Sequence, residues 1–152
     1  MLKKMKKAFT ITELVIVIAV IAILAAVLIP TFTTVVNNAN ESAAMQETKS
    51  EWTSCSAEIV TTVNASDMNY LIIHEGYAFI VLNGNLEVDP VQKDVTNDNK
   101  PTEVTTESGT YTVAGQIYGF NEDGEAVTGT EATPTAYKFS NGFDVYSLTL
   151  KA

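Results

Sequence analysis

The sequence predicts an α+β protein in which a long N-terminal α-helix packs on a C-terminal antiparallel β-sheet. Three observations support this fold class. They are an apolar run of membrane length near the N-terminus, an amphipathic pattern with helical spacing after it, and alternating segments separated by turn dipeptides in the second half. We expect a short basic segment at 1–8, a hydrophobic transmembrane helix at 9–30, an amphipathic continuation of that helix at 31–64, and a sheet domain with variable loops at 65–152.

The first of these features combines an apolar helix with a single acid. Residues 14–29 are 16 consecutive apolar residues, and together with 9–13 they can cross about 30 Å of hydrocarbon as a helix. Glu13 is the one charged residue between Lys7 and Glu41. A carboxylate inside such a segment costs about 2.5–3.5 kcal/mol on insertion scales, so we interpret Glu13 as a functional residue.

Four lysines precede the apolar run, and they predict its orientation. Positively charged flanks stay in the cytoplasm, so the rest of the chain is expected on the outer side of the membrane. The lysines are Lys3, Lys4, Lys6 and Lys7. An ordinary secretory signal would need small residues spaced as A-x-A after its core, and the alanines here never fall two apart. An uncleaved anchor remains an alternative, but it gives Glu13 no purpose.

The segment Lys6-Lys-Ala-Phe-Thr-Ile-Thr-Glu-Leu and the apolar run up to Pro30 resemble the prepilin signature of type IV pilins and pseudopilins. The resemblance makes residues 1–8 a prepilin leader peptide. It implies cleavage by prepilin peptidase between Ala8 and Phe9, followed by N-methylation of Phe9. Glu13 then becomes residue five of the mature chain and Pro30 becomes residue twenty-two, the positions that the family gives them.

The resemblance also implies a function and partners. It predicts a pilin-like structural subunit, held in the cytoplasmic membrane with its N-terminus inside and then packed into an extracellular or envelope-spanning filament. The implied partners are identical or related subunits, a prepilin peptidase that also methylates, a cytoplasmic assembly ATPase and a membrane platform protein. Adhesion, type II secretion and DNA uptake (competence) all remain open as uses. Outside this class, the alternative is a membrane-anchored surface binding domain that does not polymerise.

Two residues have predicted roles in assembly. We expect Glu13 to pair with the freed amine of Phe9 on a neighbouring subunit, because a desolvated ammonium–carboxylate pair favours one register over others. The alternative is that Glu13 reaches the membrane interface beside the leader. Pro30 lacks a backbone donor and clashes with the preceding turn, so we expect a helix kink there.

After Pro30 the apolar residues recur three or four apart, which predicts an amphipathic helix ending near Val63. The expected stripe is Phe32, Val35, Val36, Ala39, Ala43, Thr48, Trp52, Cys55, Ile59 and Val63. We expect Trp52 to pack in the core and Cys55 to be a small buried side chain, since a single cysteine cannot form an internal disulfide.

The second half predicts four to six antiparallel strands. Asn83-Gly84, Asp123-Gly124 and Asn141-Gly142 suit type I′ hairpins. The pairs that they predict are 77–82 with 86–91, 110–120 with a strand near Ala126, and 136–139 with 143–150. Segments 92–109 and 128–135 lack periodicity and are predicted to be exposed loops.

The composition excludes several function classes. The chain carries 18 acidic and 9 basic residues and no arginine, so direct nucleic-acid binding is not expected. No nucleophile, phosphate loop or metal-ligand cluster accompanies His74, so we expect no enzyme, no catalytic residue, no cofactor and no metal site. Calcium remains an alternative at two oxygen-rich stretches, Asp94 with Asn97–Asn99 and Asn121–Asp123 with Glu125.

Overall fold

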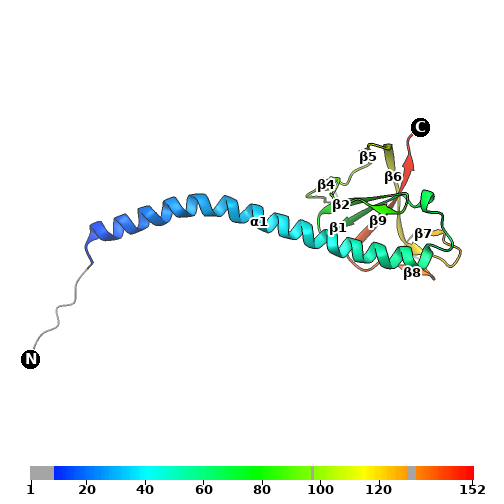
Figure 1. The fold of residues 1–152 in the computed structure, drawn as a ribbon, viewed down its shortest axis with the longest axis horizontal. Coiled ribbons are helices and arrows are strands. Elements are labelled where there is room, and N and C mark those ends of the chain that lie inside the picture. The colour runs from blue at the N-terminus through cyan, green and yellow to red at the C-terminus, as the bar shows by residue number, and fades with distance from the viewer. Residues whose placement is uncertain (1–8, 97, 130–132) are drawn as a thin grey trace, which may run out of the picture. The chain divides into compact units, whose positions relative to one another are not determined.

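The computed structural model describes residues 9–96, 98–129 and 133–152. The contacts within the chain divide it into two compact units, with the boundary after Asn40. Helix α1 (Ile11–Ile59) contributes its first part to the N-terminal unit and the rest to the C-terminal unit, where an antiparallel sheet follows it (Figure 1). A long N-terminal apolar helix and a large antiparallel sheet confirm the predicted α+β fold class.

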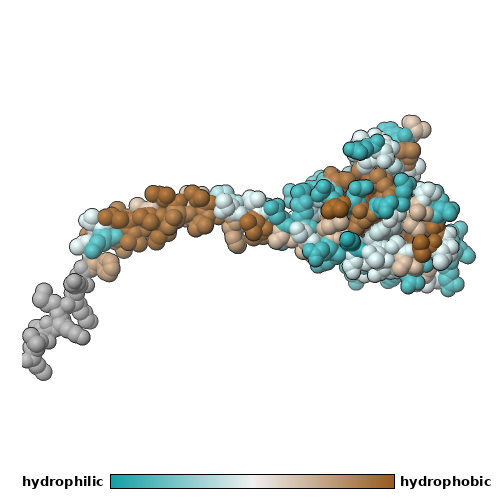
Figure 2. All heavy atoms as spheres, in the orientation of Figure 1, coloured by the Kyte–Doolittle hydropathy of each residue, from teal (hydrophilic) through white to brown (hydrophobic). Residues whose placement is uncertain are grey.

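The N-terminal unit is an exposed apolar helix. Its large apolar side chains between Phe9 and Val35 are 50–83% exposed in the single chain, and Figure 2 shows a long apolar stretch on the face of this helix that is in view. By length and composition, α1 can cross a membrane. None of this apolar surface can be stable in water by itself, so it must be covered by lipid or by other helices.

The C-terminal unit is built on one antiparallel sheet whose strands differ in length. In spatial order its main strands are β3, β2, β1, β9, β6 and β5, while β4 pairs with β2, and β7 and β8 pair with β6. A 3₁₀ turn, η1 (Ala65–Asp67), connects α1 to the sheet. The strands are β1 (Tyr70–His74), β2 (Tyr77–Leu82), β3 (Asn85–Leu86), β4 (Gln92–Lys93), β5 (Glu103–Thr106), β6 (Gly109–Phe120), β7 (Ala126–Thr128), β8 (Tyr137–Lys138) and β9 (Phe143–Leu150).

Alternation along β1 gives the sheet two buried faces. Tyr70 and Ile72 point to the face that α1 covers, whereas Leu71 and Ile73 point to the opposite face. The core under α1 contains Trp52, Cys55, Ile59, Met68, Tyr70, Ile72, Val81, Ile117, Phe120, Phe139 and Val145. The part of the predicted stripe from Trp52 to Ile59 therefore packs on one face of the sheet.

The predicted stripe is wrong in its first part, since Phe32, Val35, Val36 and Ala39 are all exposed in the single chain. Ala44 is fully buried and Ala43 is exposed, because Ala44 lies four residues before the buried Thr48 and shares its side of the helix. The helix ends at Ile59 rather than Val63, and the amides of Thr62 and Val63 both donate to the Ile59 carbonyl in a closing turn. Val63 still packs against the core.

The prediction that 92–109 is an exposed loop is wrong in part. This segment contains β4 and β5, and Val104 is 6% exposed within the core of the second sheet face. The Lys100 ammonium lies 4.1 Å from the centre of the Tyr146 ring on that face. A few apolar residues in a polar sequence are enough to fold this segment over the sheet, and their spacing gives no periodic signal.

The turn predictions had mixed outcomes. Asn83-Gly84 is a type I′ turn, since both residues have positive φ. At Asp123-Gly124 and Asn141-Gly142, only the glycine has positive φ. Glu75-Gly76 forms a further turn with positive φ at both residues and joins β1 to β2. This turn was not predicted, because glutamate is unusual at a position with positive φ.

The pairing predicted for 136–139 with 143–150 is wrong. Strand β8 pairs with β6, and β9 lies between β1 and β6. Gly119 permits the close approach of β8, because a Cβ there would collide with the Tyr137 carbonyl. The pairing of β6 with β7 confirms the second predicted hairpin. The first is confirmed only near its turn, since β2 pairs with Asn85–Leu86 and then with β4.

The described strands number nine rather than four to six, because four of them have only two or three residues. These short strands pair with longer ones. Strands of two or three residues are too short to leave an alternating pattern in the sequence. Strands β1, β2, β5, β6 and β9 are longer and match the expected number.

Thr48 leads to a stability prediction. Its hydroxyl is fully buried between α1 and the sheet, and within the described part of the chain it has no hydrogen-bond partner. Since an unpaired buried polar group costs about 1–3 kcal/mol, Thr48→Val, which keeps the shape, should stabilise the fold by about 1 kcal/mol. Thermal unfolding measures this. Thr53→Val, at an exposed position of the same helix, is the control and should change little. A lower melting temperature for Thr48→Val would contradict the assignment.

Candidate functional site

The structure describes only some of the predicted site residues at the N-terminus, because the described residues begin at Phe9. Lys3, Lys4, Lys6, Lys7 and Ala8 lie outside the described residues. Phe9 is 83% exposed and precedes helix α1, so none of the described residues covers its ring. The predicted cleavage at Ala8–Phe9 and the methylation of Phe9 stay predictions.

Glu13 lies in the first turn of α1 and takes part in a capping box with Thr10. Its Oε2 accepts hydrogen bonds from the Thr10 amide at 2.9 Å and from the Thr10 hydroxyl at 2.7 Å. In return, the Glu13 amide donates to the Thr10 hydroxyl oxygen at 3.3 Å. This reciprocal pattern satisfies amides that the start of a helix leaves without partners, and it also places a negative charge where the helix dipole favours one.

The capping box adds a second role to the one that the sequence predicted for Glu13. Among the described residues, the hydrogen bonds that its carboxylate accepts all come from Thr10, and both use Oε2. A carboxylate has about four lone-pair positions, so Oε1 can accept a donor from outside the chain while Thr10 holds Oε2. The geometry therefore fixes the direction of the carboxylate before any partner arrives.

Pro30 lies within an unbroken helix. Because proline has no amide hydrogen, the carbonyl four residues earlier loses its helical partner. Threonine hydroxyls surround this point: Thr31 donates to the Leu28 carbonyl at 2.9 Å, and Thr33 donates to that of Ile29 at 3.0 Å. Such bonds satisfy backbone oxygens inside an apolar environment and accompany helix bending. The kink at Pro30 stays a prediction.

The side chains that sequence analysis assigned to the core lie there. Trp52 is 4% exposed and donates its indole N–H to the Gly84 carbonyl at 3.0 Å, which ties α1 to the β2–β3 turn. Cys55 is fully buried, and burial, with a smaller contribution from Glu51, raises the pKa of its thiol well above its usual range. A thiol held in its protonated form is a poor nucleophile and metal ligand, which agrees with a structural role.

In both stretches considered for calcium, side-chain oxygens accept hydrogen bonds from nearby residues of the same turn. In the 121–125 turn, the Asn121 side-chain oxygen accepts the amides of Asp123 and Glu125. In the other stretch, the Asn99 side-chain oxygen accepts the Thr96 amide and hydroxyl. These oxygens serve the backbone of their own turns. Among the described residues, three ligand atoms from His, Cys, Asp or Glu come together only at Glu47, His74 and Glu75.

Sequence analysis missed two groups. The role of Thr10 could have been found, because Thr10-Ile-Thr-Glu13 has the spacing of a capping box. The approach of Glu47 to His74 had no such signal, since the two residues are 27 positions apart and belong to different elements. Three acids of α1 bond to the sheet half of the chain: Glu41, Glu47 and Glu51.

Comparison with known proteins identifies the N-terminal segment. The family model for the prokaryotic N-terminal methylation motif matches residues 3–29. No curated protein and no solved structure matched the chain. The matched residues contain the lysines, Phe9, the Thr10–Glu13 cap and the exposed apolar helix. The chain thus carries the type IV prepilin signature, which supports the class of pilin-like and pseudopilin subunits.

Proposed function

We propose that this protein is a structural subunit, a type IV pilin or pseudopilin, of an extracellular or envelope-spanning filament. It would be inserted in the cytoplasmic membrane with its lysines inside, trimmed before Phe9 and methylated there by prepilin peptidase. An assembly ATPase and a membrane platform protein would then move it into the filament. The observation that carries the proposal is the methylation motif at 3–29, which is continuous with an exposed apolar helix bearing one acid.

Helix packing between subunits explains why the N-terminal unit is apolar on all sides. In a helix that only anchors a protein, Glu13 would serve the Thr10 capping box and nothing more. A helix that moves from lipid into a bundle needs an apolar surface in both places. In the bundle, Oε1 of Glu13 would accept a hydrogen bond from the Phe9 amine of a neighbouring subunit, while Thr10 donates to Oε2.

The C-terminal unit would form the outer part of the filament. Residues 41–152 carry five lysines against 17 acidic residues, a formal charge near −12. A surface of this charge disfavours direct contact with DNA phosphates, so a scaffold role suits the unit better than a DNA receptor. Adhesion, type II secretion and DNA uptake therefore remain as uses of the whole filament rather than of one site.

Shearing and imaging of the cell surface test the proposal. Cells that carry the gene should release filaments on shearing that an antibody to residues 41–152 decorates in electron micrographs, and deletion of the gene should remove that labelling. A pseudopilin confined to the envelope should instead co-purify with related subunits after cross-linking in the membrane. A protein found only as a monomer in the membrane fraction, with no cross-linked neighbour, would favour the non-polymerising anchor.

A further inference from the structure

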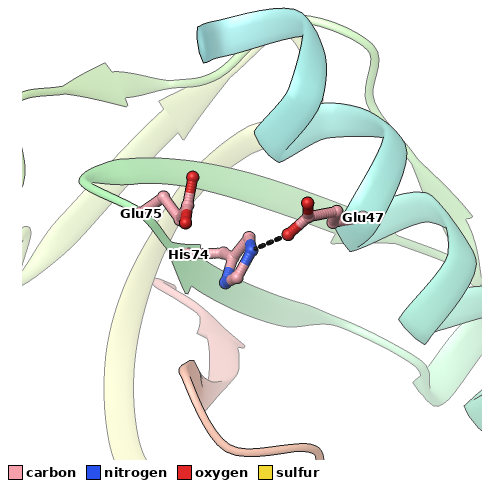
Figure 3. A group of neighbouring side chains, drawn as sticks. All are labelled: Glu47, His74 and Glu75. Carbon is pink, nitrogen blue, oxygen red and sulfur yellow. Dashed lines mark hydrogen bonds and ion pairs between the residues drawn. The ribbon is translucent and has the colours of Figure 1, made fainter.

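A buried histidine in the C-terminal unit lies between two carboxylates. His74 ends strand β1 and its side chain is 8% exposed, Glu75 follows in the β1–β2 turn, and Glu47 comes from helix α1 (Figure 3). One ligand atom from each of the three residues lies within 4.8 Å of the others. The Nε2 atom of His74 is 2.7 Å from Oε2 of Glu47.

The second ring nitrogen determines which protonation states are possible. Nδ1 of His74 is 2.9 Å from the Gly142 carbonyl oxygen, which can only accept. Nδ1 must therefore carry a hydrogen, and a neutral imidazole then has a lone pair at Nε2. That lone pair would face a carboxylate oxygen at 2.7 Å, which is repulsive unless a cation lies between them. At this distance the cation is a proton, whereas a metal ion fits once the two atoms move apart.

The surroundings of His74 favour a metal ion. An Nδ1–H bond to a backbone carbonyl is the usual way in which a metal-binding histidine fixes its tautomer and directs Nε2 at the ion. The Phe143 ring stacks on the imidazole at 3.9 Å with an angle of 8°, which holds the ring in that orientation. A proton on Nε2 accounts for the contact with Glu47 but gives Glu75 no role. A metal ion would also take Glu75 as a ligand, because its carboxylate lies beside the ring.

We propose that Glu47, His74 and Glu75 form a binding site for a divalent transition-metal ion, with Zn²⁺ as the best fit. One imidazole and two carboxylates match the nitrogen and oxygen ligands of zinc, and their two negative charges suit a dication. Zinc bonds of about 2.0–2.2 Å place tetrahedral ligand atoms about 3.3–3.5 Å apart. Entry of the ion thus requires the Glu47 carboxylate to move back by less than about 1 Å, and its side chain is 58% exposed and free to do so.

The site would lock α1 to the β1–β2 turn. Its ligands come from the helix and from the end of a central strand, so a bound ion would cross-link the two parts of the C-terminal unit. Because binding to the folded form alone stabilises it, the ion would raise the unfolding temperature in proportion to the logarithm of its concentration above Kd. A fourth coordination position would remain for water or for a group from another molecule.

Calorimetric titration with ZnCl₂ tests the site. The full-length chain, without a histidine tag and in detergent micelles, is freed of metal and titrated, and its thermal unfolding is followed with and without Zn²⁺. We expect one Zn²⁺ per chain and a higher melting temperature. Glu75→Gln and Glu47→Gln should each weaken binding by at least about tenfold.

Glu107→Gln, an exposed carboxylate in the β5–β6 turn, is the matched control and should bind as the unchanged chain does. The decisive variant is Glu75→Gln, because a proton between His74 and Glu47 would not depend on it. Equal Zn²⁺ affinity for Glu75→Gln and Glu107→Gln would overturn the proposal, as would the absence of a one-to-one complex in the unchanged chain.

Discussion

Glu13→Gln should abolish most filament formation while leaving membrane insertion and leader cleavage intact. Glutamine keeps the length of the side chain and a carbonyl oxygen that can still accept from Thr10, so the capping box survives. What it loses is the charge that would attract the amine of a neighbouring subunit. Breaking one partner of a desolvated ion pair costs about 3–5 kcal/mol, and about 1.4 kcal/mol is a factor of ten, so we expect at least a tenfold loss of sheared filaments.

Two further variants separate the charge from the cap. Thr10→Ala removes the cap but keeps the carboxylate, so it should assemble better than Glu13→Gln. Glu58→Gln removes an exposed acid from the part of α1 in the C-terminal unit and should not affect assembly. Processing of all three is checked by gel mobility before filaments are counted. Normal filament yield from Glu13→Gln, or a greater loss from Thr10→Ala, would refute the pairing role.

Phe120→Ala should be the most damaging substitution in the C-terminal unit. Phe120 is fully buried at the end of β6, and its ring lies 5.7 Å from that of Tyr70 and 5.9 Å from that of Phe139. Replacement of a buried phenylalanine by alanine costs about 3–5 kcal/mol, and domains have total stabilities of about 5–15 kcal/mol. We expect the melting temperature of this unit to fall by on the order of 10–20 °C.

Trp52 gives a direct measurement of this effect. It is the single tryptophan of the chain, it is 4% exposed, and its ring lies 5.7 Å from Tyr70 in the same core. Its fluorescence therefore reports unfolding of the C-terminal unit even when detergent keeps the apolar helix folded. Val88→Ala, at a side chain that is 71% exposed, is the control. A fall in melting temperature no larger than that of the control would show that Phe120 does not support this core.

The local features of the fold could be predicted from the sequence, while the long-range pairings could not. The stripe through Trp52, Cys55 and Ile59 follows helical spacing, and the Asn83-Gly84 turn follows from two residues that tolerate positive φ. Strand β9 pairs with β1 and β6, which are distant from it in the sequence. No segment of ten or fifteen residues contains that information.

The candidate sites divide in the same way. Glu13 and Phe9 lie within one contiguous motif, so the sequence alone points to them. The approach of Glu47 to His74 depends on how α1 lies over β1, which only the folded structure shows. Residues that act through their neighbours in sequence can be read from a chain, whereas residues that act through neighbours in space require the fold.

The mature N-terminus of the surface protein tests the central claim most directly. Mass spectrometry of the sheared or membrane-extracted protein should find a chain that begins at Phe9 and carries one added methyl group on its amine. Removal of the lysines is what frees the amine that Glu13 is proposed to bind. A surface protein that still begins at Met1, or one cut after the apolar helix, would contradict the account.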